Sequence, residues 1–266
     1  MAFSFGDLMK NLTGSLGGNA ESSVLGIDIG ASSIKIVQLR AAHGTAILET
    51  YGEIALGPYA QQPIGKAVKL SPEKIADAIT DLMKEANVTA RSGGLSIPFS
   101  SSLITVLDLP KVDKNTLKQV VPLEARKYIP VPISEVSLDW FEIPEDRADS
   151  ASAFDKIQPQ TGAGTPAQPG AGQKPKGQEI LLVAIHNDVM TNFQTTAADA
   201  GIKVEFYEIE IFSAVRACFS HGVAPVLFVD IGAATTKMYI VERGIVRLTH
   251  LLTFGGQQMT EDRKST

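Results

Sequence analysis

The stretch VLGIDIGASSIKIVQL, residues 24–39, decides the fold, because a second copy, VLFVDIGAATTKMYIV, occupies residues 226–241. The two copies align without a gap, and an aspartate, a glycine and a lysine fall at equivalent positions in both. Each copy is an apolar run ending in aspartate, a short turn and a second run of mixed polarity. This pattern predicts two strands joined by a tight turn. A repeat so far apart in the chain indicates a duplicated structural unit.

The turn residues have the composition of a phosphate-binding site. We expect the glycines of both turns to adopt positive φ, so that consecutive backbone N–H groups point at one spot. Hydroxyl groups and two lysines add donors and positive charge, and the two aspartates offer oxygen ligands for a hydrated Mg2+. The candidate cofactor-binding residues are Asp28, Gly30, Ala31, Ser32, Ser33, Lys35, Asp230, Gly232, Ala233, Ala234 and Thr235, with Asp28 and Asp230 as metal ligands.

Plainer interpretations stay open. A single Asp-Ile-Gly turn is as often an ordinary hairpin connection as it is a phosphate-binding turn. The lysines are also compatible with a solvated hairpin rim, which we favour for Lys237. Two matching turns, however, favour two related units that face each other around one phosphate chain.

The paired turns resemble the two phosphate loops of the actin, heat-shock-70 and sugar-kinase ATPase superfamily. More narrowly, the two repeats and LEARKYIPVPISEVSLDW, residues 123–140, resemble the PilM family of actin-like proteins of type IV pilus assembly. This resemblance implies an α/β, actin-like (ribonuclease H-like) two-domain fold with an inserted, FtsA-like small subdomain. It implies ATP and Mg2+ as cofactors and, at most, slow ATPase activity.

The resemblance and the composition together predict the domain organisation. We expect a flexible tail at 1–23, a first actin-like subdomain at 24–100 and 201–224, and an inserted partner-binding subdomain at 101–200. Residues 145–178 are rich in Pro, Gly, Ala and Gln, which predicts a disordered linker. Residues 225–266 begin a second actin-like domain that we expect to be incomplete, with a nucleotide cleft open on the base side.

Helix signals place the remaining elements. We expect helices at 71–87 capped by Ser71, at 113–128 capped by Asp113, and at 187–200 capped by Asn187. Pro122 predicts a break in the second of these helices. A short helix at 211–219 precedes the second turn. In the superfamily a glutamine at the start of this helix orients the attacking water, and the spacing places Ser213 there, which argues against rapid hydrolysis.

The resemblance also implies a partner, the cytoplasmic N-terminal tail of a PilN-like membrane protein. Prolines at 130 and 132 stiffen the segment after the second helix in an extended form, beside which a peptide could lie. Arg126 and Tyr128 are the candidate contact residues, because each combines a polar end with a long stem. We expect Ile129 to pack inside the subdomain instead.

Composition narrows the function classes. The net charge of -5 and the lack of a Lys/Arg cluster disfavour nucleic-acid binding. A lone Cys218, expected to be buried, allows no internal disulfide, and the scattered histidines indicate no transition-metal site. Without a signal peptide or membrane span, the chain is expected to be cytoplasmic, held at the inner membrane by its partner, with self-association left open. A small-molecule kinase of the same superfamily and a scaffold without nucleotide binding are the alternative functions.

Overall fold

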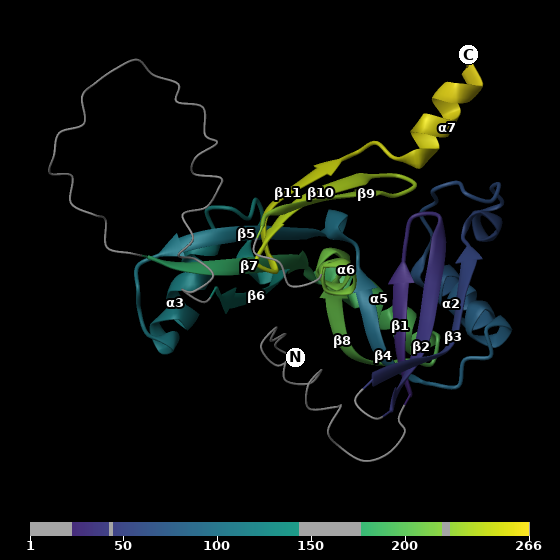
Figure 1. Cartoon of the computed structure of the whole chain (residues 1–266), viewed down its shortest axis with the longest axis horizontal. Helices are drawn as coiled ribbons and strands as arrows, with labels where there is room; N and C mark the ends of the chain where they lie inside the picture. Colours follow the sequence, from purple (N-terminus) through teal and green to yellow (C-terminus); the bar gives the residue numbers. More distant parts are fainter. Residues whose placement is uncertain (1–22, 43–44, 144–176, 220–223, 266) are drawn as a thin grey trace, which may run out of the picture.

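The computed structural model describes residues 23–42, 45–143, 177–219 and 224–265, which form three sheets and their covering helices (Figure 1). The predicted tail up to residue 22 and residues 145–176 of the predicted linker lie outside these ranges. Gln178, at the end of that predicted linker, is instead a buried strand residue paired with Leu109. The linker prediction was therefore wrong at its last residue.

A five-stranded sheet carries the first repeat. Its strand order is β3-β2-β1-β4-β8, in which β1, β2 and β3 are antiparallel neighbours and β4 and β8 run parallel to β1. The strands are β1 (Ser23–Ile29), β2 (Ser33–Ala42), β3 (Thr45–Ala55), β4 (Ser92–Ile97) and β8 (Lys203–Ile209). The short η1 helix (Gly57–Ala60) follows β3.

Two helices, α2 (Pro72–Glu85) and α5 (Asn187–Asp199), pack against each other beside this sheet. The buried face of α2 includes Ile79 and Leu82, which join Leu25 and Ile34 of the sheet in one core. Residues of α5 enter the same core, and α5 also contacts β8. We therefore propose that the inserted subdomain ends with the strand before α5, near residue 186 rather than residue 200.

The caps of these two helices differ from the predictions. Ser71 stands at the N-cap of α2, but its side chain makes no capping hydrogen bond. The N-cap of α5 is His186, while Asn187 uses its side chain to accept from Ser137 Oγ at 2.8 Å and to donate to the Ser134 carbonyl at 2.9 Å. Asn187 thus ties α5 to the inserted subdomain instead of capping the helix.

The inserted subdomain is a three-stranded antiparallel sheet in the order β5-β7-β6, packed against α3. Its elements are β5 (Ser102–Leu109), α3 (Lys114–Ala125), β6 (Val136–Glu142) and β7 (Gln178–His186), with short 3-10 helices η2 (Phe99–Ser101) and η3 (Ile133–Glu135). Asp113 caps α3 as predicted, accepting from Asn115 N at 2.9 Å. The predicted break at Pro122 is wrong, because α3 continues through Pro122 and ends three residues later, at Ala125.

The second repeat forms its own sheet, in the order β11-β10-β9. The strands are β9 (Val226–Ile231), β10 (Thr236–Glu242) and β11 (Ile245–Leu252), and the helices before and after them are α6 (Glu210–Cys218) and α7 (Gly256–Ser265). Tyr239 and Val246 face inward and share a core with Ile104 of the inserted subdomain and Val215 of α6. Cys218 is exposed, not buried as predicted.

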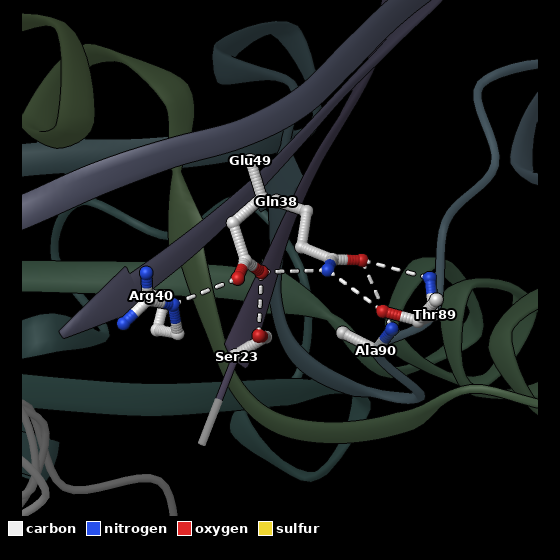
Figure 2. A network of polar contacts seen from close by, with 6 residues as sticks. All are labelled: Ser23, Gln38, Arg40, Glu49, Thr89 and Ala90. Atoms are coloured by element: carbon white, nitrogen blue, oxygen red, sulfur yellow. Dashed lines mark hydrogen bonds and ion pairs between the residues drawn. The ribbon is translucent and has the colours of Figure 1, made fainter. Parts of the chain in front are cut away.

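A polar network around the buried Gln38 stabilises the end of the first sheet away from the Gly30 turn (Figure 2). The β2–β3 pairing shifts after Gln38, so that Glu49 is an extra residue on β3 and forms a β-bulge. Gln38 is 3% exposed and accepts from the backbone N–H groups of Thr89 and Ala90, both at 2.9 Å. Its amide nitrogen donates to Glu49 at 2.7 Å and to Thr89 Oγ1 at 2.9 Å. Gln38 therefore fastens β2 to the segment that enters β4.

Candidate functional site

The two repeats form turns with the same hydrogen bonding. In the first, Gly30 N donates to the Ser33 carbonyl at 2.9 Å, and in the second, Gly232 N donates to the Thr235 carbonyl at 2.9 Å. The aspartate and lysine of each repeat are cross-strand partners, Asp28 with Lys35 and Asp230 with Lys237. The sequence repeat is thus a repeat in three dimensions.

The glycines are required for a reason other than the predicted one. Positive φ occurs at Gly65, Gly201 and Gly244 among the described glycines, so the prediction of positive φ at Gly30 and Gly232 is wrong. A Cβ at Gly30 would lie 3.0 Å from the Ser33 carbonyl oxygen, and one at Gly232 would lie 3.1 Å from that of Thr235. Each turn closes so tightly that a side chain at the glycine would press on the opposite carbonyl.

A later segment braces each turn through its carbonyl groups. In the first turn, Ala31 accepts from Val68 N at 2.9 Å and Ser32 accepts from Leu56 N at 2.8 Å. In the second turn, Gly232 accepts from Gly256 N and Ala233 accepts from Gln257 N, both at 2.9 Å. Two carbonyl groups in each turn therefore accept hydrogen bonds from backbone N–H groups elsewhere in the chain.

The segments that brace the two turns also contact each other. The side-chain oxygen of Gln257 accepts from Ala67 N at 2.8 Å, next to the residue that bonds the first turn. Gln257 itself bonds the second turn through its backbone N–H. Figure 1 shows the tips of both hairpins on the side of the molecule where α7 begins.

The two lysines occupy different environments. The Lys237 side chain is 11% exposed and pairs with Glu210 at 2.6 Å and with Asp230 at 2.9 Å. Burial opposes the charge of Lys237, but the hydrogen bonds that its ammonium group donates to Asp230 and Glu210 outweigh burial and raise its pKa. The predicted solvated rim is wrong for Lys237. The Lys35 side chain is 55% exposed, lies 3.7 Å from Glu53, and donates to Ser33 Oγ at 3.4 Å.

Sequence reasoning missed Glu210, the first residue of α6. Its carboxylate accepts from Phe99 N at 2.7 Å and from Lys237, so it links η2, which follows β4, to β10 beside the second turn. Ser213, placed at the helix start by spacing, lies within α6 and donates to the Glu210 carbonyl at 2.8 Å. An acidic residue directly after a strand and before an apolar helix was the signal available in the sequence.

The predicted metal ligands, Asp28 and Asp230, lie one residue before the end of β1 and of β9. The Asp230 side chain is 45% exposed although it pairs with Lys237. Within the described ranges no group of three or more His, Cys, Asp or Glu side chains could hold a metal ion. Mg2+ bound with a nucleotide needs only one or two protein carboxylates, since phosphates and waters complete its shell. The residues present fit such an ion.

The other predicted turn residues differ in how exposed their side chains are. Ala31 is exposed at the tip of the first turn, whereas Ser32 and Ser33 are half-buried. In the second turn Ala233, Ala234 and Thr235 are all half-buried.

The predicted partner-binding residues lie elsewhere, beyond the C-terminal end of α3. Arg126 is exposed and Tyr128 is 47% exposed, whereas Ile129 is buried at 7%, as predicted. Leu123, in the last turn of α3, is 57% exposed, and sequence reasoning did not single it out. Lys127 pairs with Glu124 at 2.6 Å on the same surface.

Comparison with known proteins matches this architecture. The family model described as type IV pilus assembly protein PilM matches residues 26–158. A structure of the PilM-PilN type IV pilus biogenesis complex aligns with a TM-score of 0.66 and 20% identity, over 90% of this chain and 63% of that chain. The cytoplasmic domain of EpsL, an inner-membrane component of the Vibrio cholerae type II secretion system, aligns with a TM-score of 0.52 and 8% identity, over 87% of this chain and 71% of that one.

The duplicated hairpins, the order β3-β2-β1-β4-β8 and the inserted three-stranded sheet define an α/β protein with the actin-like ATPase fold. The family match covers half of the chain. The chain belongs to the PilM family of type IV pilus assembly proteins. It spans 63% of the PilM-PilN chain that it matches. In the part of the chain that the structure describes, no helix has the length and apolar character needed to cross a membrane.

Proposed function

We propose that the paired turns bind ATP and that the chain acts as a nucleotide-dependent adaptor in type IV pilus assembly. The observation that carries the proposal is the bridge through Gln257, which joins the segment bracing the first turn to the second turn. Two converging turns of this kind could hold one phosphate chain between them. In the first turn, the exposed Lys35 and the hydroxyls of Ser32 and Ser33 supply the donors.

Lys237 takes a structural role in this proposal. Its ammonium group already pairs with Asp230 and Glu210, so the second turn would hold phosphate through the backbone of Ala233, Ala234 and Thr235. Asp28 and the exposed side of Asp230 would hold Mg2+ through waters. When bound, Mg2+ neutralises phosphate charge.

The proposal includes slow turnover at most. A general base must reach the proton that it removes, yet Glu210 already accepts from Phe99 N and Lys237. The Ser213 hydroxyl donates its hydrogen bond within its own helix, to the Glu210 carbonyl. Nucleotide binding, not hydrolysis, is the function that we propose for the site.

The test is to measure MgATP binding by titration calorimetry with Gly30→Val and Gly232→Val. Each added side chain meets a carbonyl oxygen of its own turn, so that carbonyl must move by a few tenths of an ångström and the turn is distorted. We expect a loss of affinity of about tenfold or more, equivalent to roughly 1.4 kcal/mol. Ala41→Val, near the far end of β2, is the control. Unchanged affinity in both glycine variants, with an unchanged circular dichroism spectrum, would refute the assignment.

We further propose that the surface beyond α3 binds the cytoplasmic tail of a PilN-like membrane protein, which would hold the chain at the inner membrane. The similar PilM structure is of a PilM-PilN complex. Here Leu123 and Tyr128 offer exposed apolar contact area beside the charged Arg126. Apolar anchors flanked by a guanidinium group suit a short peptide with apolar and acidic side chains.

A labelled PilN tail peptide tests this surface. Tyr128→Ala and Arg126→Glu are expected to weaken binding by about tenfold each, the usual scale for anchor residues. Lys114→Glu makes the same charge change at the opposite end of α3, where it should have little effect. Equal binding by all the variants would place the peptide elsewhere.

A further inference from the structure

A second set of bonds connects the segment that braces the first turn with α7. Gln257 accepts from Ala67 N at 2.8 Å and donates from Nε2 to Glu261 Oε1 at 3.2 Å. The same oxygen of Glu261 forms an ion pair with Lys66 Nζ. We call these four residues, Lys66, Ala67, Gln257 and Glu261, the latch.

The loop before α2 and the helix α7 each contribute two residues to the latch, and the two residues of each pair lie next to each other in space. Lys66 and Ala67 are neighbours in the loop before α2, while Gln257 and Glu261 are four residues apart and so share one face of α7. The bonds fix the orientation of the Gln257 amide, because its oxygen accepts and its nitrogen donates. Gln257 therefore contacts Ala67 with its side chain and Ala233 of the second turn with its backbone.

Neighbouring bonds connect the latch to the first turn as well. Val68, which follows Ala67, donates to Ala31 in the first turn. A short path of hydrogen bonds thus runs from Ala31 through the loop and Gln257 to Ala233. Any change in the separation of the two turns must stretch or break the Gln257–Ala67 bond, unless the loop or α7 moves with it.

We propose that Gln257 is a positioning residue of the nucleotide site, and that the latch sets the separation of the two turns. This role rests on the proposed nucleotide binding. It goes beyond that function because the latch residues themselves need no contact with the nucleotide. A phosphate chain held by both turns favours the separation at which the latch is closed. Nucleotide binding and latch closure then stabilise each other to the same extent, as linkage requires.

The latch is weak enough to open. Its ion pair is exposed, with 38% and 51% of the Lys66 and Glu261 side chains accessible, and such pairs contribute little to stability. The bond from Ala67 N to Gln257 is a single hydrogen bond of ordinary length. The latch is therefore suited to adjusting the affinity for nucleotide without holding the fold together.

The experiment combines MgATP titration with hydrogen exchange of the peptide that contains Ala67, using the whole chain. Gln257→Leu removes both side-chain bonds and should weaken ATP binding about fivefold and accelerate exchange at Ala67, with exchange in β1 and β10 unchanged. Gln257→Glu combined with Glu261→Gln keeps an acceptor for Ala67 N and a single carboxylate in the latch, so it should retain most of the affinity. Gln62→Leu, in the exposed part of the same loop, is the matched control.

A charge exchange provides a second readout that general loss of structure would not reproduce. Lys66→Glu places like charges together, so it should weaken ATP binding at low salt more than at high salt. Combining it with Glu261→Lys should restore the affinity. This pair also tests the latch if Gln257→Leu fails to fold.

The outcomes separate the two proposals. If the wild type binds MgATP and Gln257→Leu binds equally well, or if exchange at Ala67 does not change, the latch is refuted while nucleotide binding stands. Failure of the charge exchange to restore affinity also refutes it. If the wild type itself does not bind MgATP, the proposed function fails and the positioning role fails with it.

Discussion

Lys35 and Lys237 occupy the same position of two sequence repeats, yet their surroundings give them different roles. Lys35 keeps most of its side chain in solvent, whereas Lys237 is buried between Asp230 and Glu210. The difference arises from α6, which brings Glu210 to the second turn. At the residue scale, neighbours from other elements decide what a position shared by the two repeats does.

Lys237→Met should therefore destabilise the protein, because it leaves two carboxylates without their shared cation. We expect a loss of about 2 kcal/mol in the free energy of unfolding, less than for a fully buried pair since Asp230 is half exposed. Lys35→Met is the matched control and should change stability little. Urea denaturation of both variants measures the difference, and equal stabilities would contradict the assigned role.

The same pair gives a dependence on pH. Although burial opposes the charge, the carboxylates raise the folded-state pKa of Lys237 above its ordinary value of 10.5. Its contribution to stability is then complete below pH 10.5 and is lost as the pH rises through the folded-state pKa. The stability gap between wild type and Lys237→Met should narrow above pH 10.5 and stay constant between pH 7 and 9. A gap that widens at high pH would contradict the assignment.

Gln38 gives a prediction for a buried neutral side chain (Figure 2). Gln38→Leu keeps the approximate volume but leaves the N–H groups of Thr89 and Ala90 and the Glu49 carboxylate without this partner. We expect a loss of about 2 kcal/mol, because the buried Ala90 N–H loses its acceptor, whereas the exposed Thr89 and Glu49 can bond water. Gln62→Leu, on the exposed loop, is the control, and thermal melting of both variants is the measurement.

At the scale of elements, β6 and β7 show how the inserted subdomain tolerates the long segment between them. They are antiparallel neighbours, and Ile143 N, just beyond β6, donates to the Glu179 carbonyl at 2.8 Å. The two ends of the intervening segment are therefore held together by the sheet itself. A short connection between β6 and β7 would therefore be enough for this sheet.

Deleting residues 150–176 should accordingly leave the melting temperature within a few degrees of the wild type, because the cost of loop closure depends weakly on length. The composition of residues 145–176 also predicts that limited proteolysis cuts there first. Deleting residues 114–125 instead removes α3 from its core and should abolish folding of the subdomain. A large loss of stability in the first deletion would show that the segment packs.

At the scale of the whole molecule, the sheet of the second repeat has two unlike faces. Its inner face shares the core with the inserted subdomain and α6. Its outer face exposes large apolar residues on β9 and β11, the two strands that flank β10. These residues are Leu227, Val229, Ile231, Leu248 and Leu252, which are 39–56% exposed.

An apolar face of this kind should bind a fluorescent hydrophobic dye such as anilinonaphthalene sulfonate. Val229→Lys combined with Leu248→Lys should remove most of the dye fluorescence without lowering the melting temperature. The matched control is Leu123→Lys, which changes an equally exposed residue on α3. If the control reduces the fluorescence as much as the double variant does, the dye binds elsewhere.

The sequence by itself determined most of the elements and their order, although not α7. The alternation of apolar residues, the Asp-Ile-Gly turns and the Asp113 cap act within a few residues, so each could be identified from the chain alone. The repeat also indicated two matching hairpins, and the structure contains them. The family resemblance extended this to the actin-like fold.

Only the tertiary structure decided how the candidate site is built. It showed that Gly30 is required by a close carbonyl and not by positive φ, that Lys237 is buried, and that Glu210 reaches the second turn. It also brought Gln257 to Ala67. Each of these features depends on residues that are distant in sequence or on the exact closure of a turn. Local patterns carry no information about such contacts, because they form only when the sheets and helices pack.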